Sequence, residues 1–357
     1  MATQTFDPAK AEAFADRLLG ILNSGAIAIM ISIGHRTGLF DKLATLPPAT
    51  SQAIATAANL DESYVREWLA AMVTGQLLTY DPATQTYALP AEHGAFLTRA
   101  AGSDNIATFA QYLPQLASVE DQIVACFQQG GGVPYAQFAR FHEIMAEDSG
   151  LTVVAALEDH ILPLVPGLVA DLERGIDVLD LGCGRGLALL KLASLFPHSR
   201  FTGLDFAAEA IAFAQAQVQQ QGLANIHFAV QDAATLNAVN QYDLITTFDA
   251  IHDQARPDLV LANIARALRP TGTYLMQDIR AASDVAENLD HPIAPFLYTV
   301  SCLHCMTVSL AVGGMGLGTM WGEAKALELL GAAGFTSVEI KRLAHDLQNN
   351  FYLVRRD

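Results

Sequence analysis

A glycine-rich loop and a histidine in an acidic stretch are the two places in this 357-residue sequence where residue types and spacing point to chemistry. The loop holds Gly182, Gly184 and Gly186 after the apolar run 177–181, and glycines permit a tight turn and close approach of the backbone to a ligand. Dinucleotide-binding loops space their glycines as G-x-G-x-x-G, but Leu187 occupies the position of the third glycine here. The spacing therefore predicts a cofactor loop and disfavours a nicotinamide oxidoreductase.

Acidic residues follow the next predicted strands at positions suited to hold a cofactor. Asp205 comes directly after the predicted strand 200–204, about where a carboxylate grips ribose hydroxyls in related nucleotide folds. Asp232 follows the predicted strand 226–230, and Asp180 lies just before the glycine loop. Open α/β sheets bind ligands at the carboxyl ends of their strands, so we expect these side chains to meet at one edge.

His252 is the candidate general base. It lies in the segment 248–253, at the end of the predicted strand 242–248. A neutral imidazole titrates near pH 6.5 and can take a proton from a phenol or hydroxyl as that group attacks, which is worth roughly 10²–10⁴ in rate. A histidine that only forms local hydrogen bonds is the alternative interpretation.

The segment 279–323 is a long insertion between the fifth predicted strand and the last helix, and such insertions usually form lids or binding elements. Its aromatic and sulfur side chains suit an apolar pocket with a few polar anchors. Cys302, His304 and Cys305 invite a metal or metalloid, but zinc sites need four well-spaced ligands, so we expect thiols that line a pocket and no metal. Glu323 either orients a base or substrate or is an acid favoured by a helix N-terminus. The residues expected to contact the substrate are His142, Met145, His291, Tyr298, Cys302, Met306, Trp321 and Glu323.

The elements that position these residues follow from the alternation of apolar strands and amphipathic helices after about Gly175. This pattern predicts a doubly wound parallel sheet with helices on both faces, closed by an antiparallel pair of strands at the end of the chain. The predicted strands are 177–181, 200–204, 226–230, 242–248, 272–278, 337–342 and 351–355, and the helices between the first five are 187–196, 208–220 and 257–268.

The first part of the chain is predicted to be mainly helical, with the order helix, helix, hairpin of a winged helix. Asp61 is the expected N-cap of a helix that ends near Gly75, with Tyr64, Trp68 and Met72 on one face. The other expected elements are helices over 11–20, 26–33 and 50–58 and a hairpin of strands 77–80 and 86–89. The domains are expected to be residues 1–145 and 146–357.

The charge and composition of the chain argue against some classes of binding partner. The formal net charge of −17 argues against nucleic acid and anionic membranes, because both attract basic surfaces. The candidate recognition helix supports this conclusion, since Arg66 is its only basic residue. Four cysteines are too few and too unevenly spread for a disulfide framework, and no leader or membrane span is evident, so we expect a cytoplasmic protein.

Taken together, Asp180, the three loop glycines, the strand-end acids and the His252 segment resemble the class I S-adenosylmethionine-dependent methyltransferases. Over nearly its full length the chain resembles a bacterial winged-helix group of these enzymes, related to small-molecule O-methyltransferases, through the segments 141–148, 288–292 and 302–306. The resemblance implies a Rossmann-like seven-stranded sheet and S-adenosylmethionine as cofactor. It implies that the cofactor is held by Asp180, Gly182, Gly184, Gly186, Asp205, Phe206, Asp232, Ala233 and Phe248.

The resemblance also implies methyl transfer to a small, partly apolar acceptor, most simply at oxygen, with His252 as the base. One departure is that Gln254 stands where the family has a tryptophan after its His-Asp pair. The N-terminal region of such enzymes is used for dimerisation, which implies a homodimer here. The alternative is a cofactor-binding transcriptional regulator that uses its winged helix.

Overall fold

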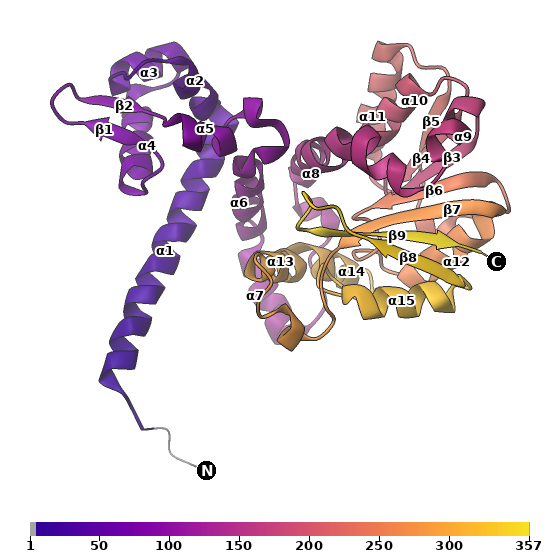
Figure 1. Ribbon diagram of the computed structural model, residues 1–357. Coiled ribbons are helices and arrows are strands. Elements are labelled where there is room, and N and C mark those ends of the chain that lie inside the picture. The colour runs from indigo at the N-terminus through magenta and orange to yellow at the C-terminus, as the bar shows by residue number, and fades with distance from the viewer. Residues whose placement is uncertain (1–4, 357) are drawn as a thin grey trace. The chain divides into compact units, whose positions relative to one another are not determined.

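The computed structural model describes residues 5–356, which form two compact units divided between Pro114 and Gln115 (Figure 1). The division lies earlier than the domain boundary expected after residue 145. Residues that follow Gln115 already belong to the second unit by their contacts: the amide of Val133 donates a hydrogen bond to Oγ1 of Thr307 at 2.8 Å. The domain boundary at residue 145 stays a prediction.

A single long helix opens the first unit. The prediction of separate helices over 11–20 and 26–33 is wrong, because α1 runs unbroken over Pro8–Thr37. Residues 21–25, which lie between the two expected helices, are helical for two reasons. A lone glycine costs a helix only about 1 kcal/mol, and the Ser24 hydroxyl donates back to the carbonyl of Gly20 at 2.9 Å, so it does not compete for other partners.

The winged-helix order of the first unit is confirmed. Asp61 caps α4 as predicted, since its carboxylate accepts a hydrogen bond from the amide of Ser63 at 3.0 Å. Of the three residues expected on one face of this helix, Trp68 and Met72 are buried and Tyr64 is 81% exposed. The further elements of this region are α2 (Leu39–Thr45), α3 (Ser51–Ala58), α4 (Glu62–Thr74), β1 (Thr79–Asp81), β2 (Thr86–Ala88), α5 (Ala91–Leu97), η1 (Arg99–Asp104), η2 (Ile106–Gln111) and α6 (Tyr112–Ala117).

The second unit is built on the predicted seven-stranded sheet, with strand order β5-β4-β3-β6-β7-β9-β8. The first five strands are parallel, while β9 pairs antiparallel with both β7 and β8. The order reverses at β3, so the carboxyl ends of β3, β4 and β6 border the place where doubly wound sheets bind ligands. The strands are β3 (Asp177–Leu181), β4 (Arg200–Asp205), β5 (Ile226–Val230), β6 (Tyr242–Phe248), β7 (Leu268–Ile279), β8 (Ser337–Lys341) and β9 (Asn349–Arg355).

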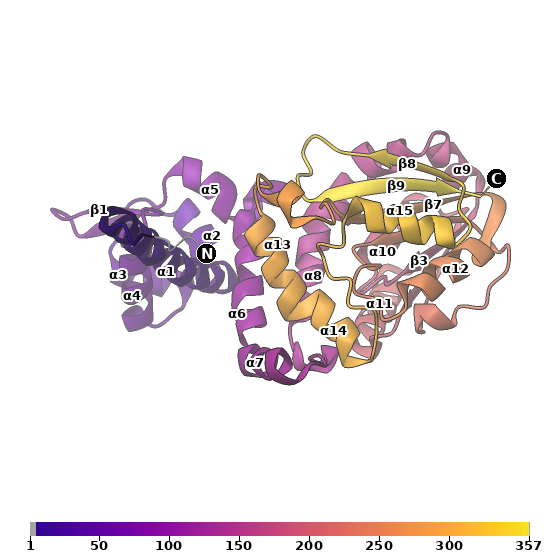
Figure 2. The same ribbon diagram turned by 90° about the horizontal axis from the view of Figure 1, so that it is seen from below.

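Helices cover both faces of this sheet, each over its own hydrophobic core. One core joins the sheet to α9, α10 and α11, and the other joins it to α12 and α15, which lie side by side in both views (Figures 1 and 2). The bounds are α9 (Leu168–Arg174), α10 (Leu187–Leu195), α11 (Ala208–Gln221), α12 (Pro257–Ala267) and α15 (Gly322–Ala332).

The remaining elements of the second unit include a helical insertion after β7. The insertion predicted over 279–323 is largely helical, and α13, η9 and α14 form one continuous helical rod (Figure 2). These elements are α7 (Glu120–Gln129), η3 (Tyr135–Gln137), α8 (Phe141–Ser149), η4 (Gly150–Val154), η5 (Leu157–Ile161), η6 (Leu162–Leu164), η7 (Ala233–Thr235), η8 (Val285–Asn288), α13 (Ala294–Val300), η9 (Ser301–Cys305) and α14 (Met306–Ala311).

Candidate active site

The three glycines of the loop after β3 differ in what surrounds them. Gly182, Gly184 and Gly186 have φ angles of 69°, 52° and 70°, a region that favours glycine. A Cβ at Gly182 would lie 2.5 Å from the Cβ of Ala250, and one at Gly186 would lie 2.4 Å from the ring of Phe228. A Cβ at Gly184 would meet no heavy atom within 4 Å. The first and third glycines are therefore required by packing, whereas the second presents bare backbone to any ligand.

Asp205 joins this loop to the next strand. One oxygen of its buried carboxylate accepts a hydrogen bond from the amide of Gly184 at 2.8 Å, and the other accepts one from Ala207 at 2.8 Å. Asp232 lies after β5, which is the neighbour of β4, and its exposed carboxylate accepts a hydrogen bond from the amide of Ala234 at 2.8 Å. The loop and both acids thus lie at the carboxyl ends of three adjacent strands, an arrangement that fits a nucleoside ligand.

Asp180 lies beneath the loop, inside the sheet. Its carboxylate is 3% exposed and accepts a hydrogen bond from the hydroxyl of Thr246 at 2.8 Å. Burial raises the pKa of Asp180 to about 7, in spite of that hydrogen bond, and the charge of Asp205 adds to the increase. Asp180 therefore changes its protonation close to neutral pH.

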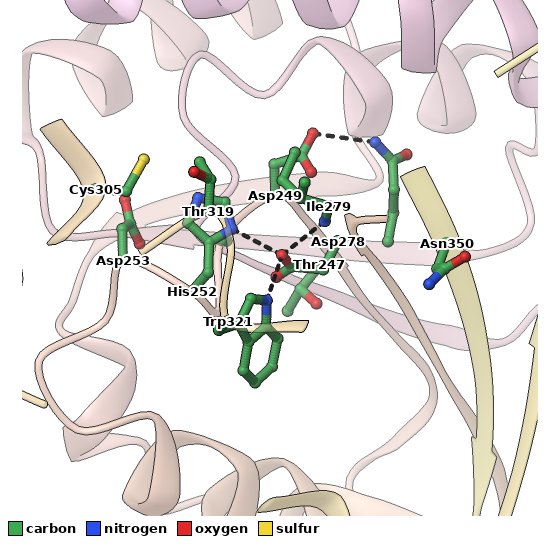
Figure 3. A network of polar contacts seen from close by, with 12 residues as sticks. Thr247, Asp249, His252, Asp253, Asp278, Ile279, Cys305, Thr319, Trp321 and Asn350 are labelled. Atoms are coloured by element: carbon green, nitrogen blue, oxygen red, sulfur yellow. Dashed lines mark hydrogen bonds and ion pairs between the residues drawn. The ribbon is translucent and has the colours of Figure 1, made fainter. Parts of the chain in front are cut away.

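His252 is buried in a network that the sequence did not reveal (Figure 3). Its Nδ1 lies 2.8 Å from Oδ1 of Asp278, near the end of β7. The same oxygen accepts hydrogen bonds from the indole N–H of Trp321 at 3.0 Å and from the amide of Ile279 at 2.8 Å. Three donors on one oxygen fix the imidazole ring, and an Nδ1–H donated to Asp278 leaves Nε2 as the basic nitrogen.

The electrostatics around His252 favour its charged form. Burial by itself would lower the pKa of the imidazole, but the carboxylate of Asp278 and, to a smaller extent, the Cys305 thiol raise it well above the usual value for histidine. Asp253 lies next to His252, and burial raises the pKa of Asp253 to about 6. The histidine is thus a stronger base than a free imidazole, and it is neutral only at a correspondingly higher pH.

A group of aromatic rings, which we call the aromatic wall, borders this part of the second unit. Tyr135 stacks on His142 at a centroid distance of 5.1 Å and meets Phe206 edge to face at 5.1 Å. His304 is fully buried and stacks on Phe141 at 3.4 Å. The wall consists of Tyr135, Phe138, Phe141, His142, Phe206 and His304.

The aromatic wall brings two predicted residues, His142 and Phe206, to the side of the site where Asp205 lies. Burial raises the pKa of Tyr135 well above its usual value, and the charges of Asp253 and Asp205 add to the increase, which places the tyrosine near both carboxylates. Tyr135 itself was not predicted. Its only sequence signal was a position after the glycine run 130–132.

The other predicted substrate residues divide between the site and its surroundings. Trp321 joins the His252 network by donating to Asp278, whereas two other predicted substrate residues of the insertion have local hydrogen bonds. His291 contacts the carbonyl of Arg280 through Nε2 at 3.1 Å, and the hydroxyl of Tyr298 accepts a hydrogen bond from Asn288 at 3.2 Å.

Four further predicted positions are less closely tied to the network. Glu323 lies in the first turn of α15 and forms an ion pair with Arg342 at 2.9 Å. This arrangement agrees with the interpretation of Glu323 as an acid at a helix N-terminus. Met145, Cys302 and Met306 are half-buried on α8, η9 and α14. Their roles stay predictions.

The sulfur and imidazole groups of η9 do not form a cluster suited to a metal. His304 and Cys305 are buried, with Nδ1 and Sγ 3.6 Å apart, while Cys302 is only half-buried. Within residues 5–356, no group of three or more His, Cys, Asp and Glu side chains is placed to hold a metal ion.

Comparisons with known proteins agree with this architecture. Residues 25–99 match the family described as an Rv2258c-like winged HTH domain, and residues 172–308 match a methyltransferase domain. Through this domain the chain is similar to the S-adenosylmethionine-dependent methyltransferases. The cofactor of this family is S-adenosylmethionine, and the predicted cofactor loop lies inside the matched methyltransferase domain.

Among curated relatives, the chain is 34% identical over 119 residues to a fatty-acid O-methyltransferase of Mycolicibacterium smegmatis, a match that covers 33% of this chain and 42% of that protein. It is 35% identical over 103 residues to a malonyl-[acyl-carrier protein] O-methyltransferase of Bacillus cereus, covering 28% of this chain and 36% of that protein. The chain thus spans less than half the length of these relatives.

Solved structures match over the whole length. The mitomycin 7-O-methyltransferase covers 98% of this chain and all of its own, with a TM-score of 0.71 and 19% identity. Human N-acetylserotonin methyltransferase, solved with S-adenosylmethionine, covers all of both chains with a TM-score of 0.68 and 18% identity. At this identity the likeness establishes the fold.

Proposed function

We propose that this chain transfers the methyl group of S-adenosylmethionine to an oxygen atom of a small, partly apolar acceptor. The observation that carries the proposal is the convergence of the glycine loop and two strand-end acids at one edge of the sheet, with the His252 network at the same edge. When bound, the cofactor supplies a methyl group on a sulfonium sulfur. The protein then needs to align the acceptor, exclude water and take up a proton.

The residues at this edge suit distinct parts of the cofactor. In the proposal, Asp205 accepts hydrogen bonds from the ribose hydroxyls, and Asp232 accepts one from the adenine amino group. The backbone of Gly184 allows close approach. The further cofactor-binding residues of the proposal are Asp180, Gly182, Gly186, Phe206, Ala233 and Phe248.

His252 is the general base of the proposal. Its Nε2 takes the proton from the acceptor hydroxyl, while Asp278 and Trp321 hold the ring through Nδ1 and stabilise the imidazolium that forms. The aromatic wall provides apolar surface for the acceptor. The predicted substrate residues His142, Met145, His291, Tyr298, Cys302, Met306, Trp321 and Glu323 remain part of the proposal.

The names of the curated relatives suggest where to look for the acceptor. Both name O-methylation of an acyl compound, and the mitomycin enzyme names an oxygen at position 7 of mitomycin. We therefore propose to assay a panel of fatty acids, phenols and matched amines for methyl transfer from S-adenosylmethionine. The panel tests both the class of acceptor and the atom that is methylated. Turnover with the amines but not with their oxygen counterparts would contradict the assignment to oxygen.

Calorimetry tests the cofactor site before any acceptor is known. We expect heat of binding with S-adenosylmethionine and S-adenosylhomocysteine and none with NAD, because Leu187 occupies the position of the third dinucleotide glycine. Binding of NAD alone would overturn the proposal.

The regulator alternative has support from the winged-helix match but not from charge. Arg66, the only basic residue of α4, is bound to Glu62 at 2.9 Å. Phosphate contacts need several basic side chains, so we expect no gel shift at moderate salt.

We further propose that the protein is a cytoplasmic homodimer held by α1. This helix exposes Leu18, Leu19, Ile21, Leu22, Ile29 and Ile33. The stretches Pro8–Thr37 and Ala294–Ala311 both have the length and hydropathy of a membrane span, but half of the second is buried in the fold. A stripe of this kind on α1 also suits a second copy of the chain.

Substitution of Leu22 tests the dimer. Leu22→Asp places a charge in the proposed interface, so light scattering after gel filtration should show a monomer where the wild type is a dimer. Val239→Asp is the matched control, because Val239 is 62% exposed and Leu22 is 63% exposed, and Val239 lies in the second unit. An unchanged mass for Leu22→Asp, or a monomeric wild type, would contradict the proposed interface.

A further inference from the structure

Asp249 has an unusual conformation at the end of β6. Its φ angle is 52°, a left-handed conformation that non-glycine residues rarely adopt outside turns and functional sites. Oδ2 of Asp249 accepts a hydrogen bond from Nε2 of Gln277 on β7 at 3.1 Å (Figure 3). The carboxylate is therefore held in place by a neighbouring strand.

Each of these two side chains has one oxygen with no partner. Among the described residues, Oδ1 of Asp249 and Oε1 of Gln277 are buried and have no hydrogen bond, and Gln277 is only 1% exposed. A buried acceptor that has lost its water without gaining a donor costs roughly 1–3 kcal/mol, so such groups in a folded protein call for an explanation. A ligand that carries hydrogen-bond donors would provide it.

The surrounding charges favour a cationic donor. The ionisable groups that face Asp249 are the carboxyls of Asp278, Asp148 and Asp346 and the imidazole of His252. Burial, and then the charge of Asp278, raise the pKa of Asp249 well above its usual value. A cation beside Asp249 would reverse part of this effect and favour the ionised carboxylate.

Asp249 lies near the glycine loop. The next residue, Ala250, lies so close to Gly182 that a Cβ on the glycine would be 2.5 Å from the alanine Cβ. The carboxylate is therefore close in the chain to the point where β6 contacts the glycine loop. S-adenosylmethionine carries one ammonium group, on its amino-acid end, and an ammonium offers three N–H donors.

We propose that Asp249 and Gln277 bind the α-ammonium group of the cofactor through their unpartnered oxygens. This proposal rests on the proposed function, since it assumes that the glycine loop binds S-adenosylmethionine. It adds two binding residues to the loop and the strand-end acids, and it gives a reason for the strained backbone of Asp249.

Three ligands separate the groups of the cofactor in a binding experiment with Asp249→Asn. S-adenosylhomocysteine has the ammonium but no sulfonium, S-adenosylmethionine has both, and methylthioadenosine has neither. Loss of a charge-assisted hydrogen bond should weaken S-adenosylhomocysteine and S-adenosylmethionine by the same factor, about 10- to 100-fold, and leave methylthioadenosine unchanged. Asparagine suits the test because it tolerates the left-handed backbone and retains an oxygen for Gln277.

Proton release gives a second readout that does not depend on turnover. Asp249 should lose a proton when the ammonium binds, so calorimetric titration of the wild type with S-adenosylhomocysteine in buffers of different ionisation enthalpy should show proton release near neutral pH. Asp249→Asn should reduce this release, while any proton released by Asp180 would remain. Glu173→Gln, which removes an exposed carboxyl of the same unit, is the control and should match the wild type.

The outcomes are separable. Equal affinity of the wild type and Asp249→Asn for S-adenosylhomocysteine would overturn the inference, as would an equal loss for methylthioadenosine or a loss confined to S-adenosylmethionine. If Asp249→Asn does not fold, Gln277→Leu removes the second oxygen and should weaken S-adenosylhomocysteine about 3- to 30-fold with methylthioadenosine unchanged. If the wild type binds none of the three ligands, the proposed function itself fails.

Discussion

His252→Ala should lower kcat by about 10²–10⁴-fold and leave the affinity for S-adenosylhomocysteine unchanged. The imidazole is buried at 3% exposure, and Asp278 fixes it through Nδ1, so Nε2 is the basic nitrogen of the network. Removal of the base leaves the alignment of acceptor and cofactor intact, and the residual rate reports that alignment. The measurement is turnover of the best acceptor from the screen, with the affinity determined by calorimetry.

Two variants make this result specific. His227→Ala removes an exposed histidine of β5 and should match the wild type. Asp278→Asn keeps the shape of the network but removes the charge that raises the pKa of His252, so it should lower kcat less than His252→Ala does. Normal turnover by His252→Ala would exclude the histidine as the base.

The ion pair of His252 and Asp278 also determines how the rate depends on pH. A base must be neutral to accept a proton, so the rate rises as the pH passes the pKa of His252. Because Asp278 raises that pKa well above the usual value, the half-maximal rate should lie on the alkaline side of an ordinary histidine. In Asp278→Asn the rise should move to lower pH, and a rise that does not move would contradict the assignment.

The sequence predicted the features that depend on local pattern. Strands β3, β5 and β6 have the predicted bounds because alternating apolar strands and amphipathic helices are visible in a short window. The N-cap Asp61 and the glycine loop are likewise local signals. The acids Asp205 and Asp232 were found because parallel strands bring their carboxyl ends to one edge whatever their separation in the chain.

The rest of the site depends on contacts that no short window contains. Asp278 meets His252 only because β6 and β7 pair in a particular register, and Trp321 joins them from 43 residues further along the chain. Tyr135 and His304 are brought together by the insertion, and apolar periodicity gives no sign of this contact. Similarly, the unpaired oxygen of Asp249 is a property of the folded chain and not of its sequence.

The second large effect is expected at Gly184, which differs from its neighbours in the loop. A Cβ at Gly182 or Gly186 would collide with the protein itself, so substitutions there would report folding as well as binding. Gly184 has open space at that point and a φ of 52°. Gly184→Val should therefore fold with a modest loss of stability and weaken S-adenosylhomocysteine about 100-fold or more, because the side chain occupies the space needed by the ligand.

Gly222→Val separates backbone strain from loss of the site. Gly222 ends α11 with a φ of 67° and also has no heavy atom within 4 Å of a built Cβ, so valine is strained there to a similar degree. Thermal unfolding should show comparable losses for both variants, while only Gly184→Val loses the ligand. Tight binding by Gly184→Val would mean that the ligand does not approach this part of the loop. Weak binding by both variants would mean that strain, and not contact, sets the affinity.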